Sequence, residues 1–161
     1  MPDEAIKIRP AVPADLDALL ALLAAVNLPP DGVADFLAGF LVARDAGGRL
    51  VGCVGLERYG NVGLLRSAAV APALQRTGLG ARLVAALLAG ARADGVREVA
   101  LLTATARDFF ARRFGFMEAK RADYEAQLVA SPEWRLPRCA SAVLMRLTLA
   151  PTCAADEDAR V

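Results

Sequence analysis

Hydrophobic residues recur along the chain with two different periods, which predicts a mixture of strands and helices. Apolar and polar residues alternate over 5–9, and leucines then recur at helical spacing over 13–26, after a Pro and Asp start. Proline, glycine and asparagine interrupt the pattern at 27–32, and 33–39 can form one or two helical turns. The beginning of the chain therefore predicts a strand followed by helical segments.

Three apolar segments follow, with short glycine-containing turns between them. The segments 40–45, 49–58 and 62–72 flank turns at 46–48 and 59–61. Short turns of this kind reverse the chain between neighbouring antiparallel strands. The pattern therefore predicts a meander of three strands.

The second half of the chain alternates between helical and strand patterns. An amphipathic helix is predicted at 81–93, ending at Asp94-Gly95, and a buried strand at 96–103. Because one strand precedes this helix and another follows it, we predict a right-handed parallel crossover. The remaining predictions are a helix at 104–113, a strand at 114–120, a helix at 123–130 and a strand at 140–149. We expect one α/β domain over 1–150 and a disordered tail at 151–161.

Composition and charge narrow the class of protein. A chain of 161 residues with a formal net charge of +1 and no block of like charges predicts one domain that binds neither nucleic acid nor a membrane surface. No apolar run approaches the ~18 residues that a membrane span needs. The charged N-terminus does not resemble a signal peptide, and Cys53, Cys139 and Cys153 form no CxxC pair. We therefore expect a cytoplasmic protein with a small ligand.

The chain contains no histidine, and this absence limits the chemistry. Acid and base catalysis must fall to carboxylates, tyrosine, cysteine, lysine or water. A Ser-His-Asp triad and a histidine-rich metal site are excluded, so we expect no metal.

The stretch QRTGLG at 75–80 leaves a predicted strand and opens a predicted helix. Such a turn commonly binds an anion, because its N–H groups point the same way and the helix dipole favours negative charge. Leu83 stands where a dinucleotide fingerprint needs its third glycine, and the GK[ST] of a Walker loop is missing. Gln75, Gly78 and Gly80 instead match Q/R-x-x-G-x-G/A, the pyrophosphate turn of the GNAT N-acetyltransferases.

Longer stretches carry the same resemblance over most of residues 5–149. The segment 64–87 resembles the strand, turn and helix of the GNAT family, and 106–116 resembles its later A-x-x-F-Y-x-x-x-G-F segment. The resemblance implies an α/β acyl-CoA N-acyltransferase fold: a mixed, twisted sheet with helices on both faces and central parallel strands that splay apart around acetyl-CoA. Strings such as "FLVARD" and "LLRSAAV" also resemble the GNAT subgroup associated with bacterial arsenic-resistance operons.

The resemblance assigns residues to the cofactor acetyl-CoA. The backbone of a predicted strand end would pair with the pantetheine arm and donate to the thioester oxygen, through Ala68, Ala69 and Val70. Backbone N–H groups of the turn would hold the pyrophosphate, through Arg76, Thr77, Gly78, Leu79, Gly80 and Ala81. Arg76 and Arg82 would add charge or simply face solvent. Phe110 is expected to pack against the cofactor.

The resemblance implies direct attack of an amine on the thioester in a ternary complex. Glu57 is the candidate base that removes the amine proton; it could instead pair with Arg58 or face solvent. Many relatives carry a glutamate where this chain has Leu64. The usual tyrosine that protonates the leaving thiolate aligns with Phe110, which cannot donate a proton. Water or a hydroxyl group could replace it, the candidates being Ser141, Tyr124 and Thr103.

The acceptor is expected to be a small-molecule amine, with an arsenical amino acid as one candidate. Arg66 or Ser67 would face the acceptor, because side chains alternate along a strand. Arginine suits a carboxylate substrate, but an ordinary ion pair with a neighbouring acid is equally compatible with its position. The alternatives are a protein lysine or N-terminal acetyltransferase and a catalytically silent acyl-CoA sensor. A homodimer is one option for the oligomeric state.

Overall fold

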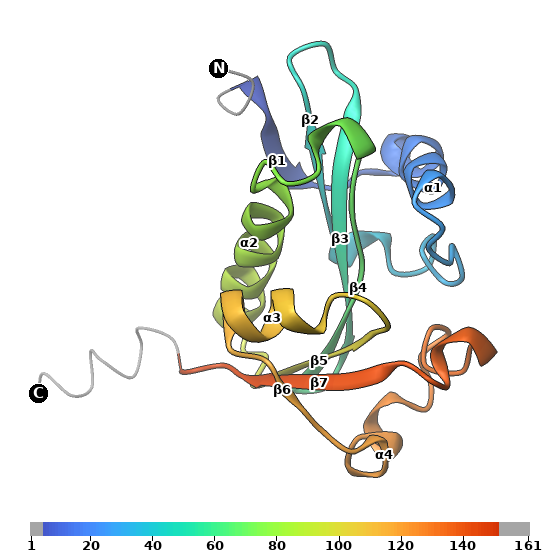
Figure 1. Ribbon diagram of the computed structural model, residues 1–161, viewed down its shortest axis with the longest axis vertical. Helices are drawn as coiled ribbons and strands as arrows, with labels where there is room; N and C mark the ends of the chain where they lie inside the picture. The colour runs from blue at the N-terminus through green and yellow to red at the C-terminus, as the bar shows by residue number, and fades with distance from the viewer. Residues whose placement is uncertain (1–4, 152–161) are drawn as a thin grey trace, which may run out of the picture. The chain divides into compact units, whose positions relative to one another are not determined.

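The computed structural model describes residues 5–151, whose strands form one seven-stranded sheet (Figure 1). The strands are β1 (Lys7–Pro10), β2 (Phe40–Arg44), β3 (Leu50–Tyr59), β4 (Val62–Val70), β5 (Glu98–Thr103), β6 (Met117–Glu118) and β7 (Val143–Thr148). Their order in the sheet is β1-β2-β3-β4-β5-β7-β6. The helices are α1 (Leu16–Ala25), α2 (Leu79–Ala93), α3 (Arg107–Phe114) and α4 (Glu125–Leu128).

The sheet confirms the predicted α/β class. β1 pairs antiparallel with β2, and β2 pairs antiparallel with β3. The predicted meander contains the second of these pairings. β4 and β5 are neighbours joined through α2, the connection that parallel neighbours require. β7 pairs antiparallel with both β5 and β6.

Three predicted elements differ from the structure. One of these differences is small: residues 33–39, for which the sequence allows one or two helical turns, form turns and one 3-10 turn, Leu37–Gly39. The strand predicted at 114–120 shrinks to β6, because Phe114 ends α3 and Gly115 takes a left-handed backbone with φ +79°. The helix predicted at 123–130 is the single turn α4. Beyond Pro151, the predicted tail lies outside the described residues.

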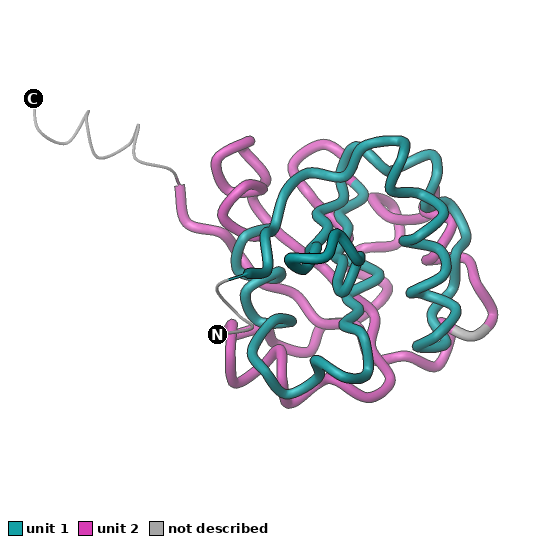
Figure 2. The backbone as a smooth tube through the Cα atoms, turned by 90° about the horizontal axis from the view of Figure 1, so that it is seen from above, with its two compact units in different colours: residues 1–57, 65–87 teal, residues 58–64, 88–161 magenta. Residues whose placement is uncertain are grey.

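The chain divides into two compact units, which Figure 2 colours separately. The first contains Met1–Glu57 and Leu65–Leu87, and the second contains Arg58–Leu64 and Leu88–Val161. The division passes through β3, β4 and α2, so the units are not successive stretches of the chain.

In the first unit, α1 and α2 cover opposite faces of the strands. Cys53 of β3 is fully buried in the cluster that contains Leu19 and Leu23 of α1. The next residue back, Gly52, faces α2, because a Cβ there would lie 2.8 Å from Leu83 Cδ1. Side chains alternate along a strand, so these contacts place the two helices on different faces. Glycine at position 52 lets Leu83 of α2 pack closely against β3.

The second unit has its own core, built from residues of β4, β5, β7 and the segment between β6 and β7. Its members are Val62, Leu64, Ala100, Tyr124, Leu128, Trp134 and Leu144. The aromatic groups in it keep their polar atoms bonded: Tyr124 Oη donates to Glu98, and Trp134 Nε1 donates to Glu125. The Arg121 guanidinium also lies 4.2 Å from the Trp134 ring centroid.

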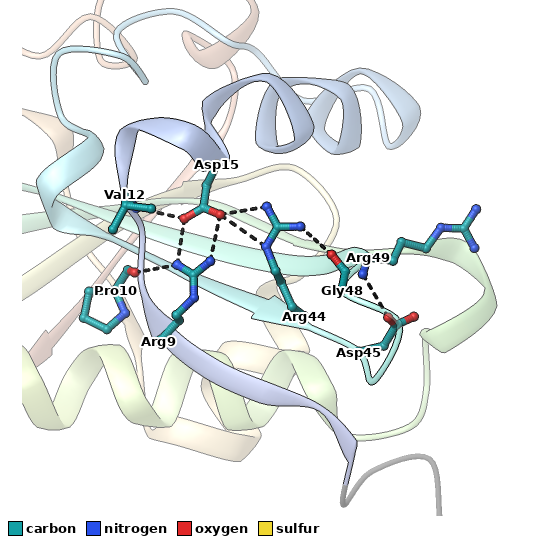
Figure 3. Close-up of polar contacts among 8 residues, drawn as sticks. All are labelled: Arg9, Pro10, Val12, Asp15, Arg44, Asp45, Gly48 and Arg49. Atoms are coloured by element: carbon teal, nitrogen blue, oxygen red, sulfur yellow. Dashed lines mark hydrogen bonds and ion pairs between the residues drawn. The ribbon is translucent and has the colours of Figure 1, made fainter.

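Asp15 connects β1, the start of α1 and β2 through one buried carboxylate (Figure 3). It is 1% exposed and accepts hydrogen bonds from Arg9, Arg44 and the Val12 N–H. Arg44 also donates to the Gly48 carbonyl in the β2–β3 turn. Hydrogen bonding from Arg9, and less strongly from Val12 and Arg44, holds the pKa of Asp15 far below 3.8.

We expect Asp15→Asn to lower the free energy of unfolding by about 1–3 kcal/mol at neutral pH, because three donors lose a charged acceptor. A lowered folded-state pKa means that the stabilisation is complete above pH 3.8 and is lost as the pH falls. In urea titrations, wild type and variant should therefore converge in acid. The exposed Asp35→Asn is the control, and an equal loss of stability in both variants would contradict this role.

Candidate functional site

The far end of β4 departs from regular strand geometry at Ser67. Its φ is +57°, in the left-handed region that serine rarely adopts inside a strand. The conformation is held from both sides: Arg66 Nε donates to Ser67 Oγ at 3.0 Å, and the Cys53 thiol donates to the Ser67 carbonyl at 3.3 Å. Irregularities of this kind change the direction of the following backbone amides and side chains. Ala68 is exposed directly after it.

Glu57 of β3 and Arg66 of β4 form an ion pair with both side chains 0% exposed. Arg66 Nη1 and Glu57 Oε2 are 2.7 Å apart. The same guanidinium donates to the carbonyls of Asp31, at 2.6 Å, and Pro29, at 3.2 Å. Arg66 therefore donates to four groups of the protein: Ser67, Glu57, Asp31 and Pro29.

The turn after β4 leads into the N-terminus of α2, as the motif at 75–80 predicts. A 3-10 segment, Pro72–Leu74, follows β4, and the Gln75 amide donates back to the Val70 carbonyl at 3.2 Å. Thr77 Oγ1 donates to the Leu74 carbonyl at 2.6 Å. The first bond ties the turn to the end of β4, and the second lies within the turn.

The first turn of α2 presents backbone N–H groups beside two glycines. A helix leaves its first N–H groups without partners inside the helix, and the Arg82 N–H already bonds to the Gly78 carbonyl. Gly78 has φ +91°, and a Cβ there would have no atom within 4 Å, so it would project into open space. A Cβ on Gly80 would contact Val70 Cγ2 at 3.6 Å. The turn therefore offers N–H groups with no side chain over Gly78.

Three predicted candidates lie in the second unit. Phe110 of α3 is 5% exposed, and its ring makes edge contacts with Phe109 and Phe116. Thr103 Oγ1 accepts from the Ala106 N–H at the start of α3. Tyr124 donates to Glu98, and burial together with this carboxylate raises the pKa of Tyr124 to about 12. Thr103 and Tyr124 thus already serve hydrogen bonds within this unit.

The structure brings several predicted site residues into contact. Glu57, Arg66 and Ser67 belong to one buried network, and Val70 bonds to Gln75 of the turn. The ion pair of Arg66 with a neighbouring acid, which the sequence left open, is present. Glu57 pairs with Arg66 in place of Arg58 or solvent. The catalytic, substrate-binding and cofactor-binding roles themselves stay predictions.

Two contributors were missed by sequence reasoning. The sequence gives Cys53 no role beyond the absence of a CxxC pair, yet its thiol donates to the carbonyl of the irregular strand residue Ser67. The carbonyls of Pro29 and Asp31 receive the Arg66 guanidinium across 37 and 35 residues of sequence. The only available signal was the Pro-Pro-Asp-Gly break itself, because backbone acceptors carry no residue signature.

Within residues 5–151, no helix is long and apolar enough to cross a membrane. The described part of the chain also contains no group of three or more histidine, cysteine or acidic residues arranged to hold a metal ion.

Residues 19–116, more than half of the chain, match the model of the acetyltransferase (GNAT) family. The chain therefore belongs to this family. The resemblance found in the sequence is confirmed at family level, and none of these comparisons points to the arsenic-resistance subgroup. No curated protein matches the sequence.

Solved structures share the fold. N-acetylglutamate synthase from Neisseria gonorrhoeae, complexed with coenzyme A and L-arginine, is 25% identical with a TM-score of 0.72; the match covers 89% of this chain and 33% of that one. Rv2747 from Mycobacterium tuberculosis, in complex with CoA and NLQ, is 26% identical with a TM-score of 0.72, over 89% and 99% of the chains. A GNAT acetyltransferase from Staphylococcus aureus Mu50 is 17% identical with a TM-score of 0.74, over 91% and 100%. This chain thus spans about a third of the gonococcal synthase chain.

We expect Cys53 to resist thiol reagents in the folded protein. It is 0% exposed, and burial raises its pKa to about 12, so little thiolate forms and little of it is accessible. In a Cys139→Ser/Cys153→Ser variant, where Cys53 is the one remaining thiol, labelling should be roughly a hundredfold slower in native buffer than in unfolding urea. Equal rates would show that Cys53 is not held in this network.

Proposed function

We propose that the protein is an acetyl-CoA-dependent N-acetyltransferase that acts on the amine of a small molecule. The observation that carries the proposal is the continuous path from the irregular end of β4, where Ala68 is exposed, into the glycine turn and the N-terminus of α2. Family membership supports acetyl transfer. The likeness to structures solved with coenzyme A supports the choice of cofactor.

The residues of this path suit the parts of acetyl-CoA. Backbone groups of Ala68, Ala69 and Val70 would pair with the pantetheine arm, since strand edges bind extended chains through main-chain hydrogen bonds. N–H groups from Arg76 to Ala81 would hold the pyrophosphate, helped by the α2 dipole. The space beside Gly78 leaves room for a phosphate to approach the backbone. Phe110 remains a proposed cofactor contact.

Bound acetyl-CoA would supply a thioester: the neutral amine nitrogen would form a C–N bond with its carbonyl carbon as the C–S bond breaks, and the proton that leaves the nitrogen would pass to water. The backbone amides after Ser67 would donate to the thioester oxygen as it gains charge. Phe110 cannot protonate the departing thiolate; since thiols have a pKa near ~8.5, coenzyme A can leave as thiolate and take a proton from water.

Two likenesses bear on the class of acceptor. An amino-acid acceptor is favoured by the likeness to a protein named N-acetylglutamate synthase, over a third of that chain. The candidate acceptor that carries arsenic rests on the resemblance of short strings to the arsenic-resistance subgroup. Arg66 is the predicted anchor for the carboxylate of an amino-acid acceptor. Its side chain is fully buried and paired with Glu57, so it would have to become accessible to bind that carboxylate. Cytoplasmic location and a homodimer remain proposals.

The test of the function is thiol release from acetyl-CoA across a panel of amines, together with calorimetry of acetyl-CoA binding. We expect binding, and turnover fastest with a small amine. The panel should include an arsenical amino acid, glutamate, common amino acids, polyamines and a lysine-containing peptide. Binding without turnover would favour a silent acyl-CoA sensor, turnover of the peptide alone a protein acetyltransferase. Absence of binding would contradict the proposal as a whole.

Gly78→Val should weaken acetyl-CoA binding roughly tenfold or more, because the new side chain projects into the space above the turn. Gly60→Val is a matched control: Gly60 also has a positive φ, +65°, and a Cβ there would also have no atom within 4 Å. Both variants should lose about 1–2 kcal/mol of stability from backbone strain. Equal affinities in calorimetric titrations of the two variants would refute the assignment of the turn.

A further inference from the structure

We infer that Glu57 and Arg66 are positioning residues: their buried ion pair fixes the irregular end of β4 and the segment at Pro29–Asp31 in one arrangement. Arg66 contacts both places directly, and Glu57 acts through Arg66. The inference rests on the proposed function only for its consequence, which is the alignment of the backbone amides after Ser67 with the thioester.

The burial of the pair makes it rigid. Neither side chain is exposed, so neither charge can be solvated by water, and each depends on the other and on its hydrogen bonds. The guanidinium is planar with donors in fixed directions, so its contacts to Glu57, Ser67 and Pro29 cannot be changed independently. A displacement of the Glu57 carboxylate would therefore move the other three contacts of Arg66.

Ser67 needs this support. A left-handed conformation is unfavourable for a non-glycine residue, and such backbone persists only where its surroundings determine it. Here Arg66 holds the side-chain oxygen and the Cys53 thiol holds the carbonyl. Ser67 immediately precedes Ala68, an exposed residue that begins the proposed cofactor segment. The direction of the amides at 68–70 consequently depends on contacts made by Arg66.

The segment at Pro29–Asp31 receives the other end of the same guanidinium. The Pro29 side chain is buried, whereas Pro30 and Asp31 are exposed. Two backbone carbonyls of this segment thus bond to a residue that also bonds to Ser67. The surface that Pro30 and Asp31 present is fixed relative to the end of β4 by one side chain. Both features belong to the first compact unit.

This role differs from that of a catalytic base, and two variants separate them. Glu57→Gln keeps the shape and one acceptor oxygen but removes the charge. Arg66→Lys keeps a cation for Glu57 but loses the planar fork that reaches Ser67, Pro29 and Asp31. A positioning pair predicts that both variants lose turnover; a base predicts that only the Glu57 variant does.

We expect kcat to fall roughly ten- to a hundredfold in both variants, with Arg66→Lys at least as slow as Glu57→Gln. The dissociation constant for acetyl-CoA should rise by a smaller factor than kcat falls, because the turn at 75–81 is untouched and only the amides at 68–70, which would pair with the pantetheine arm, are displaced. The rising limb of the pH–rate profile should keep its midpoint in Glu57→Gln, because no proton acceptor has been removed. Asp15→Asn, which alters ion pairs of a buried carboxylate elsewhere in the same unit, should keep kcat near that of wild type.

The inference is overturned if Arg66→Lys is as active as wild type while Glu57→Gln loses roughly a hundredfold or more together with the rising limb. That result would make Glu57 the base. If wild type shows no turnover with any amine, the proposed function fails, and hydrogen exchange still tests the pair. Amides at 67–70 should then exchange faster in Arg66→Lys than in wild type or Asp15→Asn; equal exchange in all three overturns the inference.

Discussion

The carboxylate of Glu57 and the guanidinium of Arg66 are both removed from water, and each makes the burial of the other tolerable. Removing one partner of such a pair costs about 3–5 kcal/mol, because the remaining charge is left buried and unpaired. The contacts of Arg66 extend this constraint to Ser67 and to the carbonyls of Pro29 and Asp31. The electrostatics of one pair thereby determine the backbone geometry at the end of β4.

Two properties of the proposed site follow from that geometry. The irregular residue Ser67 lies just before the exposed residue Ala68, and Gln75 ties the following turn to the carbonyl of Val70. The glycine turn then leads into the N-terminus of α2, with open space beside Gly78. The segment after Ser67, which would bind the thioester, is held by the buried ion pair of Glu57 and Arg66. The turn at 76–81, which would bind the pyrophosphate, uses backbone N–H groups. The two segments can therefore be disrupted separately.

The periodic and turn signals of the sequence were sufficient for most of the fold. The meander, α2 and β5 were predicted because apolar periodicity and glycine turns act locally. β6 was overestimated because Phe114 and the left-handed Gly115 belong to the end of α3, and the pairing with β7 covers only Met117 and Glu118. The motif at 75–80 indicated the turn, but the partner of Arg66 stayed open between a substrate and an acid. Side-chain pairing across β3 and β4, and bonds to distant carbonyls, depend on tertiary packing that no local pattern encodes.

The central claim is that the path from Ala68 to Ala81 receives acetyl-CoA in two sections. Hydrogen exchange of the backbone amides, followed with coenzyme A and with pantetheine, which lacks the pyrophosphate, tests it most directly. Coenzyme A should slow exchange at 68–70 and at 76–81, whereas pantetheine should slow it at 68–70 alone. Protection by coenzyme A elsewhere, with both segments unchanged, would contradict the account.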